Sequence, residues 1–289
     1  MTRWLVTGAG GMLAHDLLLQ LAGADVTALT RAELDVTDPE ATRAAVAGHD
    51  VIVNCAAYAQ VDAAESNEGA AFAVNAVGAA NLARAAAAAG ARLVHVSTDY
   101  VFSGEVFSGE ASRPYAEDAP LAPRTAYGRS KAAGEWAALA SCPRTWVVRT
   151  AWLFGAGGPN FVTTMARLAQ ERDELTVVAD QFGQPTWTRD VAAAIVRLVA
   201  RDAAYGIWHA TSQGQASWHD FAQEIFRLRG LDPERVRPIA SVDYPRPAPR
   251  PAWSVLGHER WRAAGMPLLP PWRENLARAL PLVVPTTPR

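Results

Sequence analysis

Short apolar runs alternate with alanine-rich stretches through the first half of the chain, and this alternation limits the possible folds most strongly. Five runs have the length and β-branched character of strands: RWLVT (3–7), DVTAL (25–29), DVIVN (50–54), RLVHVS (92–97) and TWVVRT (145–150). Each is nearly continuously apolar, as a parallel strand is when helices cover both faces of its sheet. The stretches between them, such as 68–89 and 127–140, are long enough for helical crossovers. The chain is therefore predicted to form an α/β doubly wound parallel sheet.

A glycine-rich turn follows the first predicted strand. In LVTGAGGMLAHDLL, Gly8 and Gly11 allow a tight turn and a close approach of the backbone to a pyrophosphate, and Ala14 takes the third small position. The N-terminus of the following helix favours the negative charge of that group. A glycine-rich turn alone is also compatible with an ordinary strand-to-helix loop. Its position after the first strand of the alternation favours a dinucleotide site in a Rossmann-type domain.

After Thr150 the alternation becomes irregular, which indicates a change of architecture. We expect residues 1–150 to form the dinucleotide-binding domain and residues 151–289 to form mainly a smaller C-terminal substrate-binding domain. A helix near 190–201 is expected to return to the large sheet. The segment DYPRPAPRPAW (243–253) is too rich in proline for a helix or a central strand, so it is predicted to be a loop.

Composition argues against nucleic-acid and membrane partners. The formal net charge is −2, so no basic surface for nucleic acid is expected, and no apolar run is long enough to span a bilayer. Two cysteines, Cys55 and Cys142, provide no disulfide framework or metal cluster and agree with a reducing compartment. Glycines occur within the first eight residues, which is not the pattern of a signal peptide. A cytoplasmic protein is therefore expected.

The end of the second predicted strand bears on the choice of nicotinamide cofactor. An acidic residue there would bind a ribose 2′-hydroxyl and favour NAD, but the chain has Thr30 and Arg31. A guanidinium can pair with a 2′-phosphate, so NADPH is favoured and NADH stays possible, while Arg31 could also be a solvated charge. Asp35 and Val36 are expected near the adenine. The stretch NCAAYA after the third strand, from Asn54 to Ala59 and including Ala57, Tyr58 and Ala59, offers small residues over which the cofactor can lie.

Lys131 is the only lysine in the chain, and it lies four residues after Tyr127 in AYGRSKAAGEW. Residues with that spacing share one face of a helix. Reduction of a carbonyl group needs a proton donor, and an adjacent cation lowers the pKa of a tyrosine toward neutrality. The ammonium can also hold ribose hydroxyls of a nicotinamide nucleotide. Tyr127 and Lys131 are therefore the candidate catalytic pair, the other reading being that Lys131 is an ordinary surface residue.

A hydroxyl group is expected where the fourth predicted strand ends, in STDYVFSG. We predict that Thr98 hydrogen-bonds the substrate carbonyl oxygen and fixes it for hydride attack. Ser97 is the competing candidate for this contact. Its alternative role is purely structural, as the residue that ends the strand. Asp99 follows directly and is expected to hold a sugar hydroxyl.

Several motifs extend these observations along nearly the whole chain: VDAAESN, VNAVGAANLARAA, STDYVFSG, AYGRSKAAGE, RTAWLFG, DQFGQPT and RPAWSVL. As a set and in this order they resemble the dTDP-4-dehydrorhamnose reductase family of extended short-chain dehydrogenases/reductases. The resemblance implies NAD(P)H-dependent reduction of the C4 carbonyl of dTDP-4-dehydro-L-rhamnose to dTDP-L-rhamnose, a step of dTDP-rhamnose biosynthesis.

The resemblance also implies roles for single residues. Tyr127 is then the proton donor, Lys131 its modulator and Thr98 the partner of the carbonyl oxygen. Positions that match cofactor contacts of the family are Gly11, Met12, Leu13, Asp35, Val36, Ala57, Tyr58 and Ala59.

Three further residues are candidates for the substrate side of the site. Trp152, in RTAWLFG, matches a substrate-contacting tryptophan of the family. An indole there offers a flat apolar face for a sugar or a base. Packing in the core is an equally open role for this residue. Asp62 and Arg250 are candidates for contacts with a sugar hydroxyl and with the diphosphate. Each of the two could also be a solvated charge.

One departure from the family concerns metal and assembly. Some family members dimerise around Mg²⁺ held by carboxylates at three positions. Here Asp16 matches the first position, whereas Arg189 stands at the second and the third falls in the apolar ALPLVV. We therefore expect no such metal site, and a monomer or a weak homodimer.

Two other functions stay open at this point. The chain could be a 4-ketoreductase that acts on another dTDP-deoxysugar of natural-product biosynthesis. It could also be a non-catalytic regulatory subunit, like that of methionine adenosyltransferase, which is related to the family. The presence of Thr98, Tyr127 and Lys131 favours catalysis.

Overall fold

The computed structural model describes residues 1–105 and 113–284, and its centre is a parallel sheet of six strands. In spatial order these strands are β10 (Gly206–His209), β5 (Thr145–Thr150), β4 (Arg92–Thr98), β3 (Val51–Asn54), β1 (Arg3–Thr7) and β2 (Asp25–Leu29). Every neighbouring pair runs parallel. The predicted α/β doubly wound sheet is thereby confirmed.

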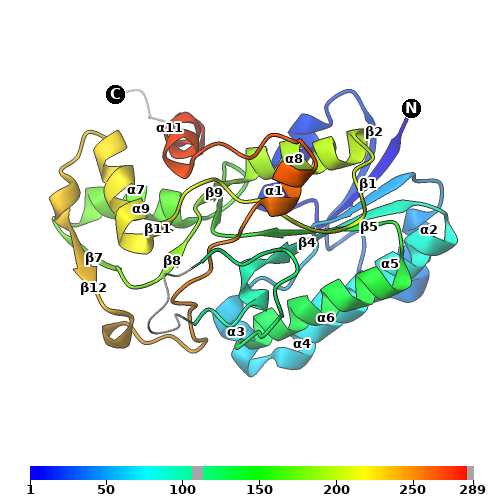
Figure 1. Ribbon diagram of the computed structural model, residues 1–289, viewed down its shortest axis with the longest axis horizontal. Coiled ribbons are helices and arrows are strands. Elements are labelled where there is room, and N and C mark those ends of the chain that lie inside the picture. The colour runs from blue at the N-terminus through cyan, green and yellow to red at the C-terminus, as the bar shows by residue number, and fades with distance from the viewer. Residues whose placement is uncertain (106–112, 285–289) are drawn as a thin grey trace.

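Helices cover both faces of this sheet, as Figure 1 shows. On one face α1 (Met12–Gln20) packs against α8 (Thr188–Ala200), and on the other α5 (Ala79–Ala88) packs against α2 (Pro39–Val46) and α6 (Ala126–Ser141). The strands supply a core to each layer because successive side chains point to opposite faces. In β1, Trp4 and Val6 join the core under α1 and α8, whereas Leu5 joins the core under α2 and α5. Burial on both faces explains why these strands are so uniformly apolar in sequence.

The second half of the chain builds a smaller layer with its own core around Phe221. Its larger elements are α7 (Phe161–Glu171), β7 (Leu175–Val178), α9 (Trp218–Leu228), β12 (Val236–Ile239) and α11 (Trp272–Val283). Short strand pairs complete it: β6 (Leu153–Phe154) with β9 (Thr186–Trp187), and β8 (Phe182–Gly183) with β11 (Ala216–Ser217). In Figure 1 these elements lie at one end of the sheet, beyond β4 and β5.

More of the second half returns to the large sheet than the sequence indicated. The expected helix, α8, lies on α1, but β10 also extends the sheet beside β5. Trp261, in α10 (Glu259–Ala263), and Leu269 belong to the core under α1 and α8. We propose the same division into a dinucleotide-binding and a substrate-binding domain, with these returning segments assigned to the first.

The remaining helical segments are short. They are α3 (Val61–Ser66), α4 (Glu68–Phe72), the π-helical η1 (Ala73–Gly78), and the 3₁₀ turns η2 (Asp99–Val101), η3 (Pro233–Arg235) and η4 (Ser241–Asp243). Of these, α4 and η1 pack against α6. The proline-rich segment after η4 is a loop, as predicted. None of the described helices combines the length and the hydropathy that a membrane span requires.

Candidate functional site

The glycine-rich turn between β1 and α1 is held close to the loop after β3. Gly8 has a φ of +68°, and a Cβ there would lie 2.6 Å from the backbone nitrogen of Ala56, so only glycine fits. Gly10 faces open space, and Gly11 begins α1 without any side-chain cap. The backbone N–H groups at this helix end are thus the donors available to a phosphate. Met12 opens the helix, and Leu13 lies in the core.

The residues after β2 divide into anchored and exposed ones. The Thr30 hydroxyl and backbone N–H both donate to the Glu33 carboxylate, at 2.7 and 2.8 Å. Arg31 is exposed and makes no ion pair within residues 1–105 and 113–284. The side chain of Thr30 is therefore held by Glu33, whereas Arg31, the residue predicted to pair with a 2′-phosphate, has no ion-pair partner among the described residues. Asp35 accepts two hydrogen bonds from Thr37, which hold the pKa of its carboxyl low.

Val36 and the loop after β3 line the next part of this edge. Val36 is buried against Gly78, and its carbonyl accepts a hydrogen bond from Asn81 at 3.2 Å. The Asn75 amide binds Tyr58 on both sides, accepting from its N–H at 2.8 Å and donating to its carbonyl at 3.1 Å. Ala57 and Ala59 flank Tyr58, so Asn75 fixes the course of all three candidate cofactor contacts.

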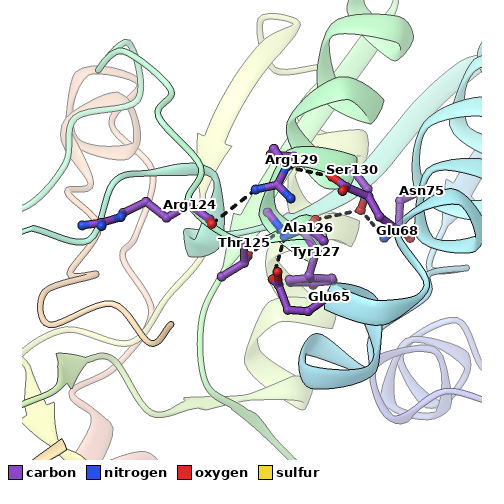
Figure 2. Close-up of polar contacts among 10 residues, drawn as sticks. Glu65, Glu68, Asn75, Arg124, Thr125, Ala126, Tyr127, Arg129 and Ser130 are labelled. Atoms are coloured by element: carbon purple, nitrogen blue, oxygen red, sulfur yellow. Dashed lines mark hydrogen bonds and ion pairs between the residues drawn. The ribbon is translucent and has the colours of Figure 1, made fainter. Parts of the chain in front are cut away.

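Tyr127 lies in the first turn of α6, whose start is anchored at several points (Figure 2). Thr125 caps the helix by accepting from the Gly128 N–H at 2.9 Å, and Glu65 accepts from the Ala126 N–H at 2.8 Å.

Further contacts surround these two hydrogen bonds. They are the Arg129–Glu68 ion pair and the hydrogen bonds of Ser130 with Tyr127 and Asn75. The Tyr127 ring packs with Tyr58 in a small apolar cluster. The position of the tyrosine is therefore set by both α3 and the loop after β3.

The predicted neighbour of Tyr127 at the end of β4 is Thr98. The Thr98 hydroxyl acts to lower the pKa of Tyr127, although burial dominates and raises that pKa to about 12. The same hydroxyl donates to Asp99 Oδ1 at 3.0 Å and accepts from the Tyr100 N–H at 3.2 Å. The structure thus places a buried strand-end hydroxyl beside the tyrosine, and its hydrogen bond to a substrate carbonyl oxygen stays a prediction.

Lys131 is a buried residue and not a surface one, with 3% of its area exposed. Its Nζ donates to the Val96 carbonyl at 2.6 Å, and burial lowers its pKa to about 8, against the opposing effect of Glu135. The prediction that this ammonium lowers the pKa of Tyr127 is wrong here. Burial of the phenol raises that pKa, and Lys131 is directed to the backbone of β4.

Comparison with known proteins agrees with this geometry. Residues 2–284 match the family model described as the RmlD substrate binding domain. The chain belongs to this family. It is 52% identical to a dTDP-4-dehydrorhamnose reductase of Streptomyces griseus, over 96% of this chain and 93% of that protein. It is 50% identical to a probable dTDP-4,6-dihydroxy-2-methyloxan-3-one 4-ketoreductase of Streptomyces antibioticus, over 96% and 95% of the two chains.

A solved structure shares the whole architecture. The dTDP-4-dehydrorhamnose reductase of Bacillus anthracis, in complex with NADP, superposes with a TM-score of 0.91 at 37% identity, over 96% of this chain and 99% of that one. The resemblance drawn from the motifs is therefore confirmed.

Aromatic and cationic residues gather around Trp218 in the second half of the chain. Trp152 has a φ of +45° and stacks on Trp218, with ring centroids 3.6 Å apart, while Gly183 lies against its indole. A cavity of about 500 Å³ opens beside Trp218. Its lining includes Tyr100, Phe161, Tyr244, Arg246 and Arg250. The sequence singled out Trp152 and Arg250 but missed Trp218, which stands 66 residues further along.

Asp62 and Arg250 form an ion pair with each other, and both side chains are only partly exposed. Arg250 donates to Asp62 at 2.8 Å, and the Ala248 N–H donates to the same carboxylate at 3.2 Å. Burial acts to raise the pKa of Asp62, but the Arg250 guanidinium and Ala248 outweigh it and lower that pKa. The pair ties the proline-rich loop to α3.

The sequence also missed a buried polar network behind Lys131. Glu135 and Arg149 form an ion pair at 2.7 Å with 1% of each side chain exposed, and the Ser97 hydroxyl donates to Glu135 at 2.5 Å. Ser97, the alternative to Thr98, is therefore bound to this network. The available signal was Glu135 itself, four residues after Lys131 and so on the same helical face.

Asp16 and Arg189, which stand at two of the positions that match the Mg²⁺ site of some family members, contact other residues of the chain. The buried Asp16 carboxylate accepts a hydrogen bond from the Thr188 hydroxyl. The Arg189 guanidinium lies over the Trp187 ring, 5.6 Å from its centroid. Asp16 thus serves to join α1 to α8.

Proposed function

We propose that the chain reduces the C4 carbonyl of dTDP-4-dehydro-L-rhamnose to dTDP-L-rhamnose with NADPH. The observation that carries this proposal is the meeting of Thr98 and Tyr127 at the carboxyl edge of the sheet, with Lys131 buried one turn further along α6. Ligands bind at this edge in open parallel sheets. The 52% identity to the Streptomyces griseus reductase supports the choice of sugar.

In this proposal the side chains of the chain divide the work at the carbonyl. NADPH, when bound, supplies the hydride. Tyr127 gives its proton to the carbonyl oxygen, and the pKa of about 12 keeps that proton on the phenol at neutral pH. Thr98 holds the same oxygen. The Lys131 ammonium, whose Nζ donates to the Val96 carbonyl, supplies further donors for ribose hydroxyls of the cofactor.

The first half of the chain holds the groups that fit a dinucleotide. Gly8, Gly11, Met12 and Leu13 would bind the pyrophosphate at the uncapped start of α1, which faces open space at Gly10. We propose that Arg31, beside the anchored Thr30, binds the 2′-phosphate and makes NADPH the preferred cofactor. The rest of the nucleotide would follow the loop residues Asp35, Val36, Ala57, Tyr58 and Ala59.

The cavity beside Trp218 fits a nucleoside diphosphate. Phe161 and Trp218 line it, and aromatic side chains of this kind can pack against a pyrimidine. Arg246 and Arg250 provide the positive charge that a diphosphate needs. Asp62 completes the proposal as a contact of the sugar, Asp99 is buried beside Thr98, and Trp152 contributes by orienting Trp218.

A second candidate is reduction of a different dTDP-4-dehydro sugar. It is favoured by the 50% identity to the Streptomyces antibioticus 4-ketoreductase, which differs little from the identity to the rhamnose enzyme. The catalytic residues would be the same in both cases. The non-catalytic regulatory alternative is disfavoured because Thr98, Tyr127 and Lys131 are all in place.

The decisive experiment is to follow NADPH oxidation with dTDP-4-dehydro-L-rhamnose and with a second dTDP-4-dehydro sugar. Turnover with either excludes the regulatory alternative. A higher kcat/KM for the rhamnose precursor supports the first candidate, and the reverse order supports the second.

Assembly and location complete the proposal. We propose a monomer or a weak homodimer, because Asp16 is bound to Thr188 and Arg189 stands where a second carboxylate would be needed. Cys55 and Cys142 are both free thiols, which agrees with work in the reducing cytoplasm. The resulting partners are the dTDP-sugar and the nicotinamide cofactor.

A further inference from the structure

Asp99 is a buried carboxyl group with too few hydrogen-bond partners for a charge. It follows Thr98 at the end of β4 and has 2% of its area exposed. Its Oδ1 accepts from the Thr98 hydroxyl at 3.0 Å, whereas its Oδ2 has no partner among the described residues. An ionised carboxylate offers about four acceptor positions, and a buried one that is so poorly satisfied is costly.

The groups around Asp99 compensate for a negative charge only in part, and those that hydrogen-bond it are hydroxyl groups and backbone N–H groups. Tyr100 faces it from its own turn, Tyr127 from α6 and the Ser254 hydroxyl from the segment after the proline-rich loop. No lysine or arginine forms an ion pair with it within the described ranges. Burial accordingly raises the pKa of Asp99 to about 6, although the Ser254 and Thr98 hydroxyls oppose this rise.

The charge state of Asp99 decides where the single proton of Thr98 points. When Asp99 is ionised, Thr98 must donate to it, and the Thr98 oxygen accepts from the Tyr100 N–H. Thr98 then has no proton left for a substrate oxygen. When Asp99 is neutral, the carboxyl O–H can donate to Thr98, which frees the Thr98 proton.

We propose that Asp99 is a positioning residue that works as a neutral acid, donating to Thr98 so that Thr98 donates to the reacting carbonyl oxygen beside Tyr127. This inference rests on the proposed function and deepens it. The carbonyl oxygen becomes negative during reduction, so a chain of two hydrogen bonds stabilises it, whereas an ionised Asp99 would repel it. A bound nucleotide with its phosphates adds burial and negative charge, and both favour the neutral form further.

The inference predicts a particular pH dependence. The kcat/KM of the parent should fall as the pH rises through about 6, because that ratio reports the free enzyme. The midpoint for kcat, which reports the substrate complex, should lie higher. Asp99→Asn removes the titration but keeps an N–H donor for Thr98, so it should retain the low-pH rate and lose the step.

Thr98→Val serves as the matched test of the relay. It should lower kcat about tenfold below pH 6, as expected for one hydrogen bond, and should leave only the part of the step that comes from repulsion by an ionised Asp99. Adding Asp99→Asn to Thr98→Val should then remove the rest of the step and change the low-pH rate little, because the two residues act in series. A step near pH 6 that persists in Asp99→Asn, or a step of full size in Thr98→Val, would overturn the inference.

A second measurement does not depend on turnover. The infrared difference spectrum between the parent and Asp99→Asn, recorded across the pH range in the NADPH-loaded protein, reports the protonated carboxyl of Asp99. The band should persist to a pH of about 6 or above. A midpoint near the ordinary aspartate value of about 4 would overturn the inference, whether or not the proposed substrate is reduced. Asp99→Ser replaces the Asn variant in both measurements if that variant does not fold.

Discussion

At the scale of single residues, burial dominates the chemistry of the site. Tyr127, Asp99 and Lys131 all have pKa values displaced toward their neutral forms, to about 12, 6 and 8 respectively. A tyrosine that keeps its proton at neutral pH is a donor and not a base. This is the protonation state that reduction of a carbonyl requires, because a proton is delivered to the oxygen.

Replacing the proton donor tests this assignment. Tyr127→Phe should keep the fold, because the Tyr127 ring packs in an apolar cluster and its backbone carbonyl keeps its bond from Ser130. General acid catalysis typically contributes about 10²- to 10⁴-fold, so kcat should fall at least about a hundredfold. The measurement is NADPH oxidation with cofactor affinity determined in parallel. Near-normal turnover would show that another group supplies the proton.

Arg31 provides a test of cofactor choice. Arg31→Ala should raise the KM for NADPH while leaving that for NADH unchanged, because only NADPH carries a 2′-phosphate. Loss of one charge-assisted hydrogen bond corresponds to about 1.5–3 kcal/mol. Arg43→Ala, at an exposed arginine paired with Glu40, is the control and should change neither value. Equal effects of Arg31→Ala on both cofactors would make Arg31 an ordinary surface charge.

Some residue roles were predictable and others were not. Thr98, Tyr127 and Lys131 follow from strand ends and helical spacing, which are local properties. The Asp62–Arg250 pair and the Trp152–Trp218 stack join residues far apart in the chain, and only the assembled fold brings them together. The direction of the Tyr127 pKa was missed because spacing reveals the neighbouring cation but not the loss of water.

At the scale of elements, close packing of helices positions the site. The stretch predicted as one helix over 68–89 consists of α4, η1 and α5 in succession. Its π-helical turn presents Asn75 to α6 at Gly134, where any Cβ would collide with the Asn75 carbonyl oxygen. Hydrophobic periodicity predicts helix here, but it does not reveal a local change of hydrogen-bonding pattern. The bounds predicted for the first five strands of the large sheet, which depend on local apolar runs, agree with the structure within one residue.

Gly134→Ala should therefore be destabilising despite the better helix propensity of alanine. Overpacking of this kind typically costs about 1–3 kcal/mol. Gly69→Ala is the matched control, since a Cβ at Gly69 in α4 meets nothing within 4 Å and should be neutral or stabilising. Chemical denaturation of both variants measures the difference. If Gly134→Ala is as stable as the parent, α6 and η1 are not in close contact.

At the scale of the whole molecule, buried histidines join distant parts of the chain. His209, on β10, donates through Nδ1 to the Gly257 carbonyl at 3.0 Å and accepts at Nε2 from Arg149. Burial, reinforced by Arg149, lowers the pKa of His209 to about 3, and burial lowers that of His258 to about 4. His95 is shifted in the same direction.

These shifts predict that the protein loses stability in acid. Below the unfolded histidine pKa of about 6.5 the unfolded chain takes up protons that the folded chain does not, so stability is lost as the pH falls. Asp99, whose pKa is raised, opposes the loss below about pH 6. With three such histidines, the free energy of unfolding at pH 5 should be lower than at pH 7 by about 3–5 kcal/mol.

Urea denaturation at both pH values measures this change. His209→Gln can keep both hydrogen bonds without titrating, so its loss between pH 7 and pH 5 should be smaller by about 2 kcal/mol. An unchanged loss in this variant would show that His209 is not held neutral by the fold.

The central claim is that this molecule transfers a hydride to C4 of a dTDP-4-dehydro sugar, and isotope transfer tests it most directly. The protein would be incubated with dTDP-4-dehydro-L-rhamnose and NADPH that carries deuterium at both C4 positions of the nicotinamide, and the product analysed by NMR. The expected product is dTDP-L-rhamnose with deuterium at sugar C4. Absence of a reduced sugar, or a product without deuterium at that carbon, would contradict it.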